Sequence, residues 1–413
     1  MSTAVIDQHR PSTPQLTWRE ALKFGSLVAL THRLLLTIWL AVSVLLGMRT
    51  GHYIVDIHIV TGPLPELNTF AEQLLLGVWR RWDGLHYLNL AANGYRAEDP
   101  MPTVFGMLTP WLIRAADRVL PGSLEVGAIA VETFAVAAAM TLLYRLVGQV
   151  YGDRDLARWS VLVLALHPLS HYLAAPMTDA LYLAFCLAYF MALLDEKWWL
   201  VGVFGLLAAL TRHQGVLLLV PAAIVVLKQQ LDQKRIVVRD LLTRSPAFVL
   251  PPLGYLAFVM FRQVRGLAPL GTVLETYYLV SFVDPVTGLL TNLRTFVTDP
   301  LMAVLNVNIL AVPVSIGLLA VSIIRPAHRH WPFIGYTISH LVLFVSKLSA
   351  YPGNTVVYTE SMARYTLALF PLIVITADWL RGRGKWLRLA AVAFLLVWLL
   401  MYSALYAMGY GPF

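Results

Sequence analysis

Charged residues are scarce in this chain. Only 13% of its 413 residues are Asp, Glu, Lys or Arg, 58% are hydrophobic, and the mean hydropathy is +0.68. Soluble domains contain about 25% charged residues. The composition therefore excludes a water-soluble globular domain and predicts an integral membrane protein.

The chain contains a single cysteine, and its N-terminal segment lacks the pattern of a signal peptide. The single cysteine, Cys186, lies in an apolar run, which excludes an intramolecular disulfide and suggests an inert packing residue. Residues 1–25 are polar, with no apolar stretch before a small-residue cleavage site, so they do not form a removable signal peptide. The first membrane helix is expected to act as its own insertion signal.

The sequence patterns of soluble nucleotide-sugar enzymes are absent too. No metal-ligand spacing, glycine-rich phosphate loop or Ser-His-Asp order occurs. We therefore expect neither a bound metal nor a cofactor.

Apolar runs recur along the whole chain, and about 20 helical residues cross a bilayer. They predict an all-α, polytopic membrane fold of about eleven transmembrane helices, in one domain over residues 1–413. The segment 198–228 is either two short helices or one interrupted helix. The expected spans are 27–47, 124–146, 158–175, 178–194, 198–211, 214–228, 246–262, 301–324, 332–348, 365–380 and 388–408.

The basic residues indicate the orientation of the chain. The net charge of +8 comes from Lys and Arg in short loops, which indicates topology rather than nucleic-acid binding. With a cytoplasmic N-terminus, the basic loops lie inside, as the positive-inside rule requires. Two long loops, about 48–123 and 263–300, then lie outside. Apolar spacing at 70–76 and 82–92 predicts interfacial helices in the first of them.

Ionisable residues in or beside apolar runs are costly in a membrane and usually face a cavity or a partner. For Arg33, Lys347 and Asp378 we expect a helix-end position from which the side chain reaches the interface. For Asp179, helix capping by Thr178 or Asp179 and a functional role are equally open. The other candidates are His167, His171, Arg212, His213 and Arg364.

The densest polar segment, residues 80–95, lies in the first outer loop. Asp83 and His86 are three residues apart, so on a helix they share a face, and Gly94 is suited to end that helix. One interpretation is a binding face with a base, a donor and aromatic rings. The other is an amphipathic helix whose Trp82 and Tyr87 anchor in lipid headgroups, with solvated charges.

By the predicted topology, several charged residues meet at the outer face. Guanidinium groups bind phosphate through two parallel N–H donors, and a carboxylate can accept a hydroxyl proton. Such a combination suits a phosphorylated substrate that carries a sugar. The residues are Asp56, Asp83, Asp179, Arg212 and Arg364, with Tyr365 beside the last.

Three blocks of sequence share an order with a known family. The first is RWDGLHY at 81–87 with NGY at 93–95. The second runs from HPLSHYLA at 167–174 through TDALYL at 178–183 to ALTR at 209–212, and the third is RY at 364–365 with FP at 370–371. In this order they resemble the PIG-V-like mannosyltransferases, the family that includes the enzyme adding the second mannose to GPI anchors. The chain departs from the family's F-F-P-x-Y-P run at residues 104–110.

The resemblance implies a GT-C glycosyltransferase, a polytopic enzyme that takes a sugar, usually mannose, from a polyprenyl phosphate on the non-cytoplasmic face. It implies a single inverting displacement at the sugar C1, with Asp83 as general base and Asp56 in reserve. The expected substrate-binding residues, with the lipid phosphate held by the last two, are Arg81, Trp82, His86, Tyr87, Asp179, Tyr365, Arg212 and Arg364.

The implied partners are a polyprenyl-phosphate sugar donor, a lipid or cell-envelope glycan acceptor and the bilayer, with no nucleic acid. Short loops and the lack of a retention signal indicate a bacterial plasma membrane, with the site facing outward. A transporter or flippase for a lipid-linked or anionic solute is the competing interpretation. It predicts inverted repeats and a charged path through both leaflets, and neither is found. A non-catalytic membrane scaffold is a third.

Overall fold

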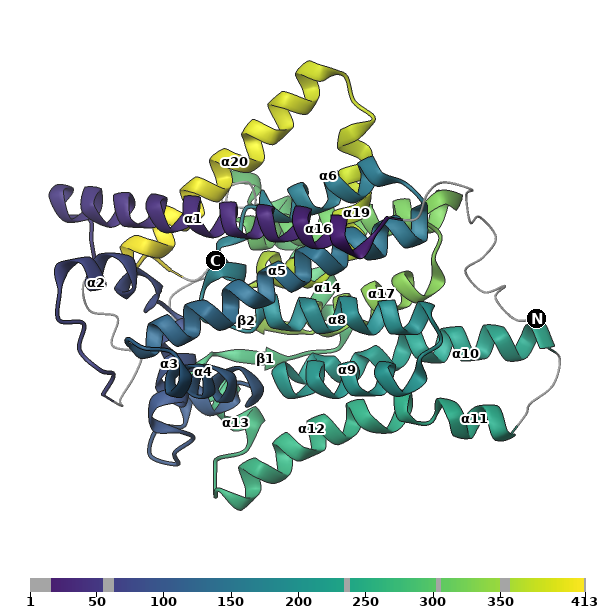
Figure 1. Cartoon of the computed structure of the whole chain (residues 1–413), viewed down its shortest axis with the longest axis horizontal. Coiled ribbons are helices and arrows are strands. Elements are labelled where there is room, and N and C mark those ends of the chain that lie inside the picture. The colour runs from purple at the N-terminus through teal and green to yellow at the C-terminus, as the bar shows by residue number, and fades with distance from the viewer. Residues whose placement is uncertain (1–15, 55–62, 234–237, 302–305, 350–356, 412–413) are drawn as a thin grey trace.

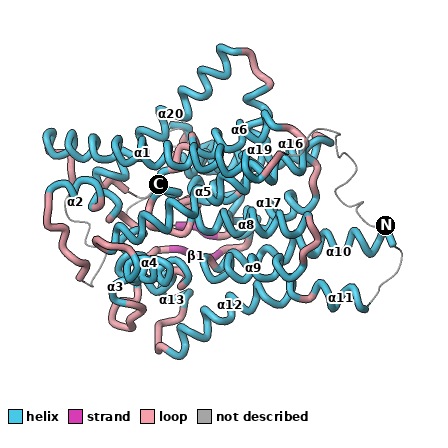
Figure 2. The backbone as a smooth tube through the Cα atoms, in the orientation of Figure 1, coloured by secondary structure: helices cyan, strands magenta, loops and turns pink. Residues whose placement is uncertain are grey.

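The computed structural model describes residues 16–54, 63–233, 238–301, 306–349 and 357–411, and helices dominate it (Figure 1, Figure 2). The short α2 and α3 lie at one end of the bundle and α10 and α11 at the other (Figure 1). The longer helices are α1 (Trp18–Thr50), α5 (Leu124–Tyr151), α6 (Arg154–Ala165), α8 (Asp179–Leu194), α9 (Trp198–Thr211), α10 (Leu219–Gln233), α12 (Pro246–Val264), α16 (Val307–Ile324), α17 (Trp331–Val345), α19 (Phe370–Arg381) and α20 (Lys385–Met408).

The predicted all-α membrane fold is confirmed, whereas the count of about eleven spans is not. Among the described residues, six helices are long and apolar enough to cross a membrane. One bent helix pair meets the same test, and α8, α9 and α17 are shorter apolar helices. The six spans are Trp18–Thr50, Leu124–Tyr151, His213–Asp232, Leu242–Val264, Val307–Ile324 and Lys385–Met408.

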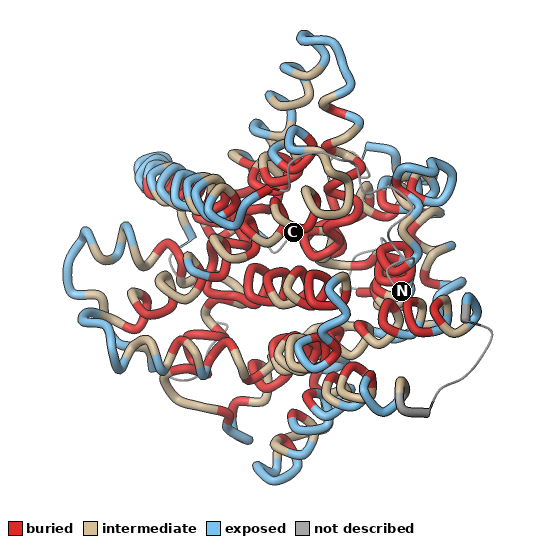
Figure 3. The backbone as a smooth tube through the Cα atoms, turned by 45° about the vertical axis from the view of Figure 1, so that its right-hand side comes forward, coloured by how far each residue is buried: buried red, intermediate tan, exposed pale blue. Residues whose placement is uncertain are grey.

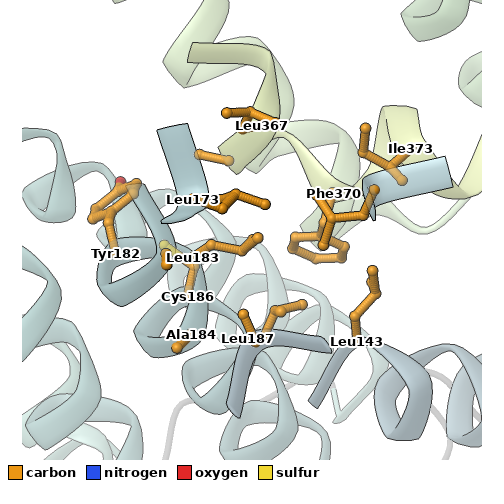
Figure 4. Close-up of a cluster of buried hydrophobic side chains, with 14 of the residues drawn as sticks. Leu143, Leu173, Tyr182, Leu183, Ala184, Cys186, Leu187, Leu367, Phe370 and Ile373 are labelled. Carbon is orange, nitrogen blue, oxygen red and sulfur yellow. The ribbon is translucent and has the colours of Figure 1, made fainter. Parts of the chain in front are cut away.

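Helix α8 lies at the centre of the core. It has almost no polar face, because other helices cover it on every side. Buried residues dominate the middle of the molecule, and exposed ones gather on the outer helices (Figure 3). In Figure 4, Cys186 of α8 lies beside Leu183, and Leu143 of α5 and Phe370 of α19 belong to the same buried cluster. Cys186 is fully buried and free, as expected for a packing residue.

The segment 198–228 is two helical segments. Helix α9 ends at Thr211, Arg212 has an extended backbone, and the 3₁₀ helix η4 (His213–Leu218) leads into α10. A Cβ at Gly215 would meet the backbone nitrogen of Ala209 at 2.2 Å, so η4 folds closely back against α9. The extended Arg212 therefore marks the turn between the two segments.

The predicted helix at 158–175 is interrupted. Helix α6 stops at Ala165, and a separate turn, α7 (His171–Ala174), follows. Pro168 lacks an N–H group and disfavours helical geometry at His167. The hydroxyl of Ser170 donates to the carbonyl of Ala165 at 2.7 Å and so satisfies a group that the break exposes.

Three other predicted helices have different ends. Helix α16 begins at Val307, where the side chain of Asn306 caps it, and residues 302–305 of that prediction lie outside the described part of the chain. Helix α17 ends at Val345, because the chain then pairs with another segment. The predicted helix 365–380 is α18 (Met362–Tyr365), η6 (Thr366–Ala368) and α19, with a bend of 85° before α19. Pro371 in the first turn of α19 suits a fresh helix start there.

The first long loop is largely helical. The predicted helices at 70–76 and 82–92 correspond to α2 (Phe70–Leu75) and α3 (Asp83–Asn93), and most of α3 is buried rather than half in water. The loop also contains η2 (Gly77–Trp79), η3 (Met101–Val104) and α4 (Leu108–Val119), which were not predicted.

Two short strands join the later loops. Strand β1 (Val280–Phe282) pairs antiparallel with β2 (Lys347–Ser349), with Phe282 opposite Lys347 and Val280 opposite Ser349. They are small exceptions to the all-α prediction. The remaining elements are α11 (Val238–Arg244), α13 (Leu270–Tyr277), α14 (Pro285–Thr298) and η5 (Pro326–His328).

Candidate active site

An ion-pair network joins distant parts of the chain. Arg364 donates to Oδ2 of Asp179 from Nε at 3.0 Å and from Nη2 at 2.8 Å, and its Nη1 contacts Oδ2 of Asp83. Arg212 donates from Nη2 to Oδ1 of Asp179 at 2.8 Å, and from Nε to the Thr178 hydroxyl at 2.5 Å. Charged residues of α3, α8, the end of α9 and α18 therefore meet at one point.

A strained turn presents Asp83. Trp82 has a φ of 49°, in the left-handed region, where a non-glycine residue is strained. Such strained residues are frequent at functional sites. Asp83 is the first residue of α3, and Gly84 follows it. A Cβ at Gly84 would meet the carbonyl oxygen of Trp79 at 2.9 Å and Pro176 at 3.1 Å. The glycine thus lets α3 begin against the segment that leads to Asp179.

The two arginines are held by turns of the backbone. Arg364 follows Ser361, which has a φ of 59°, and its guanidinium lies 4.7 Å from the ring centre of Tyr172. Arg212 follows the last turn of α9, where a Cβ at Gly106 would meet the carbonyl oxygen of Thr211 at 2.3 Å. The close approach of Gly106 brings the first outer loop against the base of Arg212.

The network opens on a cavity of about 290 Å³, close to the size of a small-ligand site. One wall is aromatic: the ring centre of Phe105 lies 5.4 Å from that of His86 and 4.8 Å from that of Tyr87. Tyr278 lies 6.4 Å from His86, edge to face. Further polar lining residues are Thr211, His213, Gln214, Lys347, Ser349 and Glu360. Such a mixed lining suits a polar ligand with flat, weakly apolar faces, such as a sugar ring.

Asp83 is the carboxylate of the network that faces the cavity. Its side chain is 26% exposed, whereas that of Asp179 is 1% exposed. Among the described residues, only Oδ2 of Asp83 accepts a hydrogen bond, so Oδ1 has acceptor capacity left. A carboxylate that is fixed by an arginine on one side and open on the other can take a proton from a bound hydroxyl.

His86 and Tyr87 offer hydrogen bonds rather than charge. Burial lowers the pKa of His86 and raises the pKa of Tyr87, so both side chains are neutral near pH 7. The hydroxyl of Tyr87 lies 3.3 Å from the hydroxyl of Thr178. Nδ1 of His86 has no hydrogen-bond partner in the part of the chain that the structure describes.

The structure brings most of the predicted site residues to this cavity. Asp179 does not line it but lies behind the two arginines, and neither it nor Thr178 forms a side-chain cap on α8. The capping interpretation of Asp179 is therefore wrong. The predicted residues that line the cavity are Trp82, Asp83, His86, Tyr87, Arg212, Arg364 and Tyr365.

A further predicted residue, Arg81, does not line the cavity either. Arg81 is buried away from the cavity, where its Nε donates to the carbonyl of Ala407 at 3.2 Å and its guanidinium lies 4.9 Å from the ring centre of Tyr53. The prediction that Arg81 contacts substrate is corrected, because the side chain ties the loop to α20 and to the chain after α1. Asp56 lies outside the described residues.

Lys347 was expected at a helix end facing the interface, and its place in the cavity was not predicted. Because α17 stops at Val345, Lys347 lies on β2 and lines the cavity instead. A signal was available, since a lone lysine at the outer end of an apolar span runs against the positive-inside rule. Arg33 was also expected at a helix end, yet it lies in the middle of α1, 5.0 Å from the ring centre of Trp79.

Within the described ranges, no group of three or more His, Cys, Asp or Glu side chains is arranged to hold a metal ion.

Part of the chain is similar in sequence to known mannosyltransferases. Residues 104–259 match the family described as dolichyl-phosphate-mannose-protein mannosyltransferase. GPI mannosyltransferase 2 of Schizosaccharomyces pombe is 26% identical over 158 residues, which are 37% of this chain and 32% of that protein. The alignment thus spans about a third of this relative's length.

A solved structure is also similar to the chain. It is the crystal structure of ArnT from Cupriavidus metallidurans bound to undecaprenyl phosphate, with 12% sequence identity and a TM-score of 0.49. The similarity covers 92% of this chain and 74% of ArnT. The matched family and the relative are both mannosyltransferases, so this part of the chain is similar to mannosyltransferases, as the sequence blocks predicted.

Proposed function

We propose that the chain transfers mannose from a polyprenyl-phosphate donor to a hydroxyl group of a lipid-linked or cell-envelope glycan acceptor. The observation that carries this proposal is the position of Asp83, which lines the cavity with Oδ2 held by Arg364 and with Oδ1 accepting no hydrogen bond from another described residue. The similarity to two kinds of mannosyltransferase supports the sugar. The basic loops at the opposite end of the bundle support a site on the non-cytoplasmic face, which we propose is that of a bacterial plasma membrane.

The proposed reaction is one displacement with inversion. The acceptor oxygen attacks C1 of the mannose while its proton passes to Oδ1 of Asp83. The bond between C1 and the phosphate oxygen breaks, and polyprenyl phosphate leaves with that electron pair. Arg364 holds Asp83 in place and, with Arg212, keeps Asp179 paired, so the carboxylate is oriented before substrate binds. The aromatic wall of His86, Tyr87 and Phe105 would pack against the sugar rings.

The transporter alternative lacks such support. The described ion-pair network and its cavity lie at one end of the bundle, and both matched groups of proteins are transferases. A transferase needs no charged path through both leaflets, and none was found in the sequence.

The test is a transfer assay on the purified full chain in lipid nanodiscs. Polyprenyl-phosphate mannose is supplied with a panel of lipid and glycan acceptors, and GDP-mannose and polyprenyl-phosphate glucose serve as control donors. We expect mannose transfer from the polyprenyl-phosphate mannose alone, with an inverted anomeric centre in the product. Transfer from GDP-mannose, or retention of the anomeric configuration, contradicts the proposal.

A further inference from the structure

The positive charges at the cavity are not equivalent. Arg364 directs its Nε and Nη2 to Asp179 and its Nη1 to Asp83. Arg212 directs its Nη2 to Asp179 and its Nε to Thr178. Both guanidinium groups are therefore engaged with the carboxylates that they hold, and moving either toward a ligand would break a buried ion pair, which is costly.

Lys347 differs from both arginines. Its ammonium lies 5.7 Å from the ring centre of Tyr365 and 6.0 Å from that of Phe282, and it forms no ion pair with another described residue. The residue is partly buried on β2, and its side chain reaches the cavity. An ammonium in such a place has lost part of its hydration free energy, and the interaction with aromatic rings compensates for only a fraction of that loss.

The surroundings of Lys347 favour an anion. Burial, together with the charge of Arg212, lowers the pKa of Lys347 to about 8. The titratable and charged groups that share its cavity are Asp83, His86, Tyr87, Arg212, His213, Tyr277, Tyr278, Glu360, Arg364 and Tyr365. A phosphate oxygen at the ammonium would supply the missing counter-charge without disturbing either arginine.

We propose that Lys347 binds the phosphate group of the lipid-linked donor, while Arg212 and Arg364 position Asp179 and Asp83. The inference rests on the proposed function and assigns its donor subsite. It replaces the phosphate contact that the family resemblance implied for the two arginines. The β1–β2 pairing fixes Lys347 against Phe282, so the ammonium has a set position for the phosphate.

The proposal predicts a pH dependence of donor use with a definite sign. Below pH 8 the ammonium is charged and binds the donor, and as the pH rises through about 8 the unliganded side chain loses its proton. The KM for the donor should therefore rise above that pH. In Lys347→Arg the guanidinium stays charged to above about pH 12, so this rise should disappear.

The experiment measures donor binding and transfer separately, with the full chain in nanodiscs. Lys347→Met should weaken binding of polyprenyl phosphate by about 10- to 100-fold, the range of one charged hydrogen bond, and raise the donor KM equally with little change in kcat. Lys385→Met, at an exposed lysine of the opposite end, is the matched control and should change neither. Phosphatidylglycerol replaces polyprenyl phosphate in a parallel arm, to separate the donor from bulk anionic lipid.

Each outcome separates this inference from the proposed function. If the parent chain transfers mannose but Lys347→Met has the parent's donor affinity, or Lys347→Arg keeps the rise in KM, the assignment of Lys347 is wrong. Equal losses of affinity for both lipids also overturn it, because they indicate a general lipid contact. If the parent chain neither binds polyprenyl phosphate nor transfers mannose, the proposed function itself is wrong.

Discussion

Two triads of the same composition lie at opposite ends of the bundle. At the candidate site, Arg364 pairs with Asp83 and Asp179. At the other end, Arg381 pairs with Asp153 and with Asp378, at 2.8 Å from Nη2 to Oδ1. A further basic side chain joins each: Arg212 contacts Asp179, and His328 contacts Asp378 at 2.9 Å.

The triads differ in burial and in what their carboxylates do. Arg364 is 7% exposed and Asp179 1%, whereas Arg381, Asp153 and Asp378 are 27%, 33% and 23% exposed. Asp153 also caps α6, accepting from the backbone nitrogen of Leu156 at 2.9 Å. The Arg381 triad thus ties the start of α6 to the end of α19. An Asp–Arg–Asp pattern alone does not identify a site; burial beside a cavity and an open carboxylate oxygen do.

The largest expected effect comes from Asp83→Asn. The change keeps the size and most hydrogen bonds of the side chain but removes the proton acceptor, so transfer should fall by about 100- to 10,000-fold. Binding of polyprenyl phosphate should stay at the parent value. Asp155→Asn, at an exposed carboxylate near the Arg381 triad, is the control and should leave transfer unchanged. Near-parent transfer by a folded Asp83→Asn chain would remove Asp83 as the base and make Asp56→Asn the next test.

Asp179→Ala should cause the next largest effect, on stability. It leaves Arg212 and Arg364 without their shared buried partner, a loss of about 3–5 kcal/mol in the free energy of unfolding. The matched change at the Arg381 triad, Asp378→Ala, exposes its partners to water and should cost about 1 kcal/mol or less. Denaturant titration of both variants in detergent measures the difference. Equal losses would mean that the two triads are energetically alike.

Arg364→Lys tests whether the planar guanidinium group, with its several N–H donors, is needed. An ammonium cannot hold both carboxylates in their present geometry, so transfer should fall by about 10- to 100-fold, as expected for a lost charged hydrogen bond. Arg381→Lys at the other triad provides the control and should keep parent kcat and KM. Full activity in Arg364→Lys would show that charge alone suffices to orient Asp83.

The smallest expected effect is that of Arg381→Ala. Its ion pairs are partly exposed, so the stability loss should be about 1 kcal/mol or less, and transfer should be unchanged. Thermal unfolding and the transfer assay in parallel measure both. A fall in transfer with unchanged stability would reveal a coupling between the two ends of the bundle that the contacts do not suggest.

The long apolar runs predicted most of the helices well. The bounds of α8, α9 and α12 agree within two residues, because hydropathy alone determines which segment enters the bilayer. The breaks after Ala165 and before Phe370 were not predicted, since an apolar run continues through both. At such points a helix ends at a proline, at a residue with positive φ or where a strand partner pairs with the chain. The mean hydropathy of a segment does not register these local features.

The site was predictable in its charged residues but not in its geometry. Asp83 and Arg364 lie outside the matched segment 104–259, and their convergence followed from sequence blocks and topology. Which way a side chain points could not be predicted from these blocks: Arg81 and Asp83 are two residues apart, yet only Asp83 faces the cavity. Lys347 was misassigned because the end of α17 depends on a pairing with residues some 65 positions earlier.

Because of the β1–β2 pairing, the number of residues between α17 and β2 decides which side chains of β2 face the cavity. Lys347 and Ser349 line the cavity, and Leu348 between them is buried on the other face of β2, as the two-residue alternation of a strand requires. Deleting one residue between Val345 and Lys347 would shift the strand by one position and present a leucine where an ammonium now stands. A change of one residue in the spacing between α17 and β2 therefore reverses the two faces of the strand. Single insertions and deletions there would replace a cationic cavity wall with an apolar one.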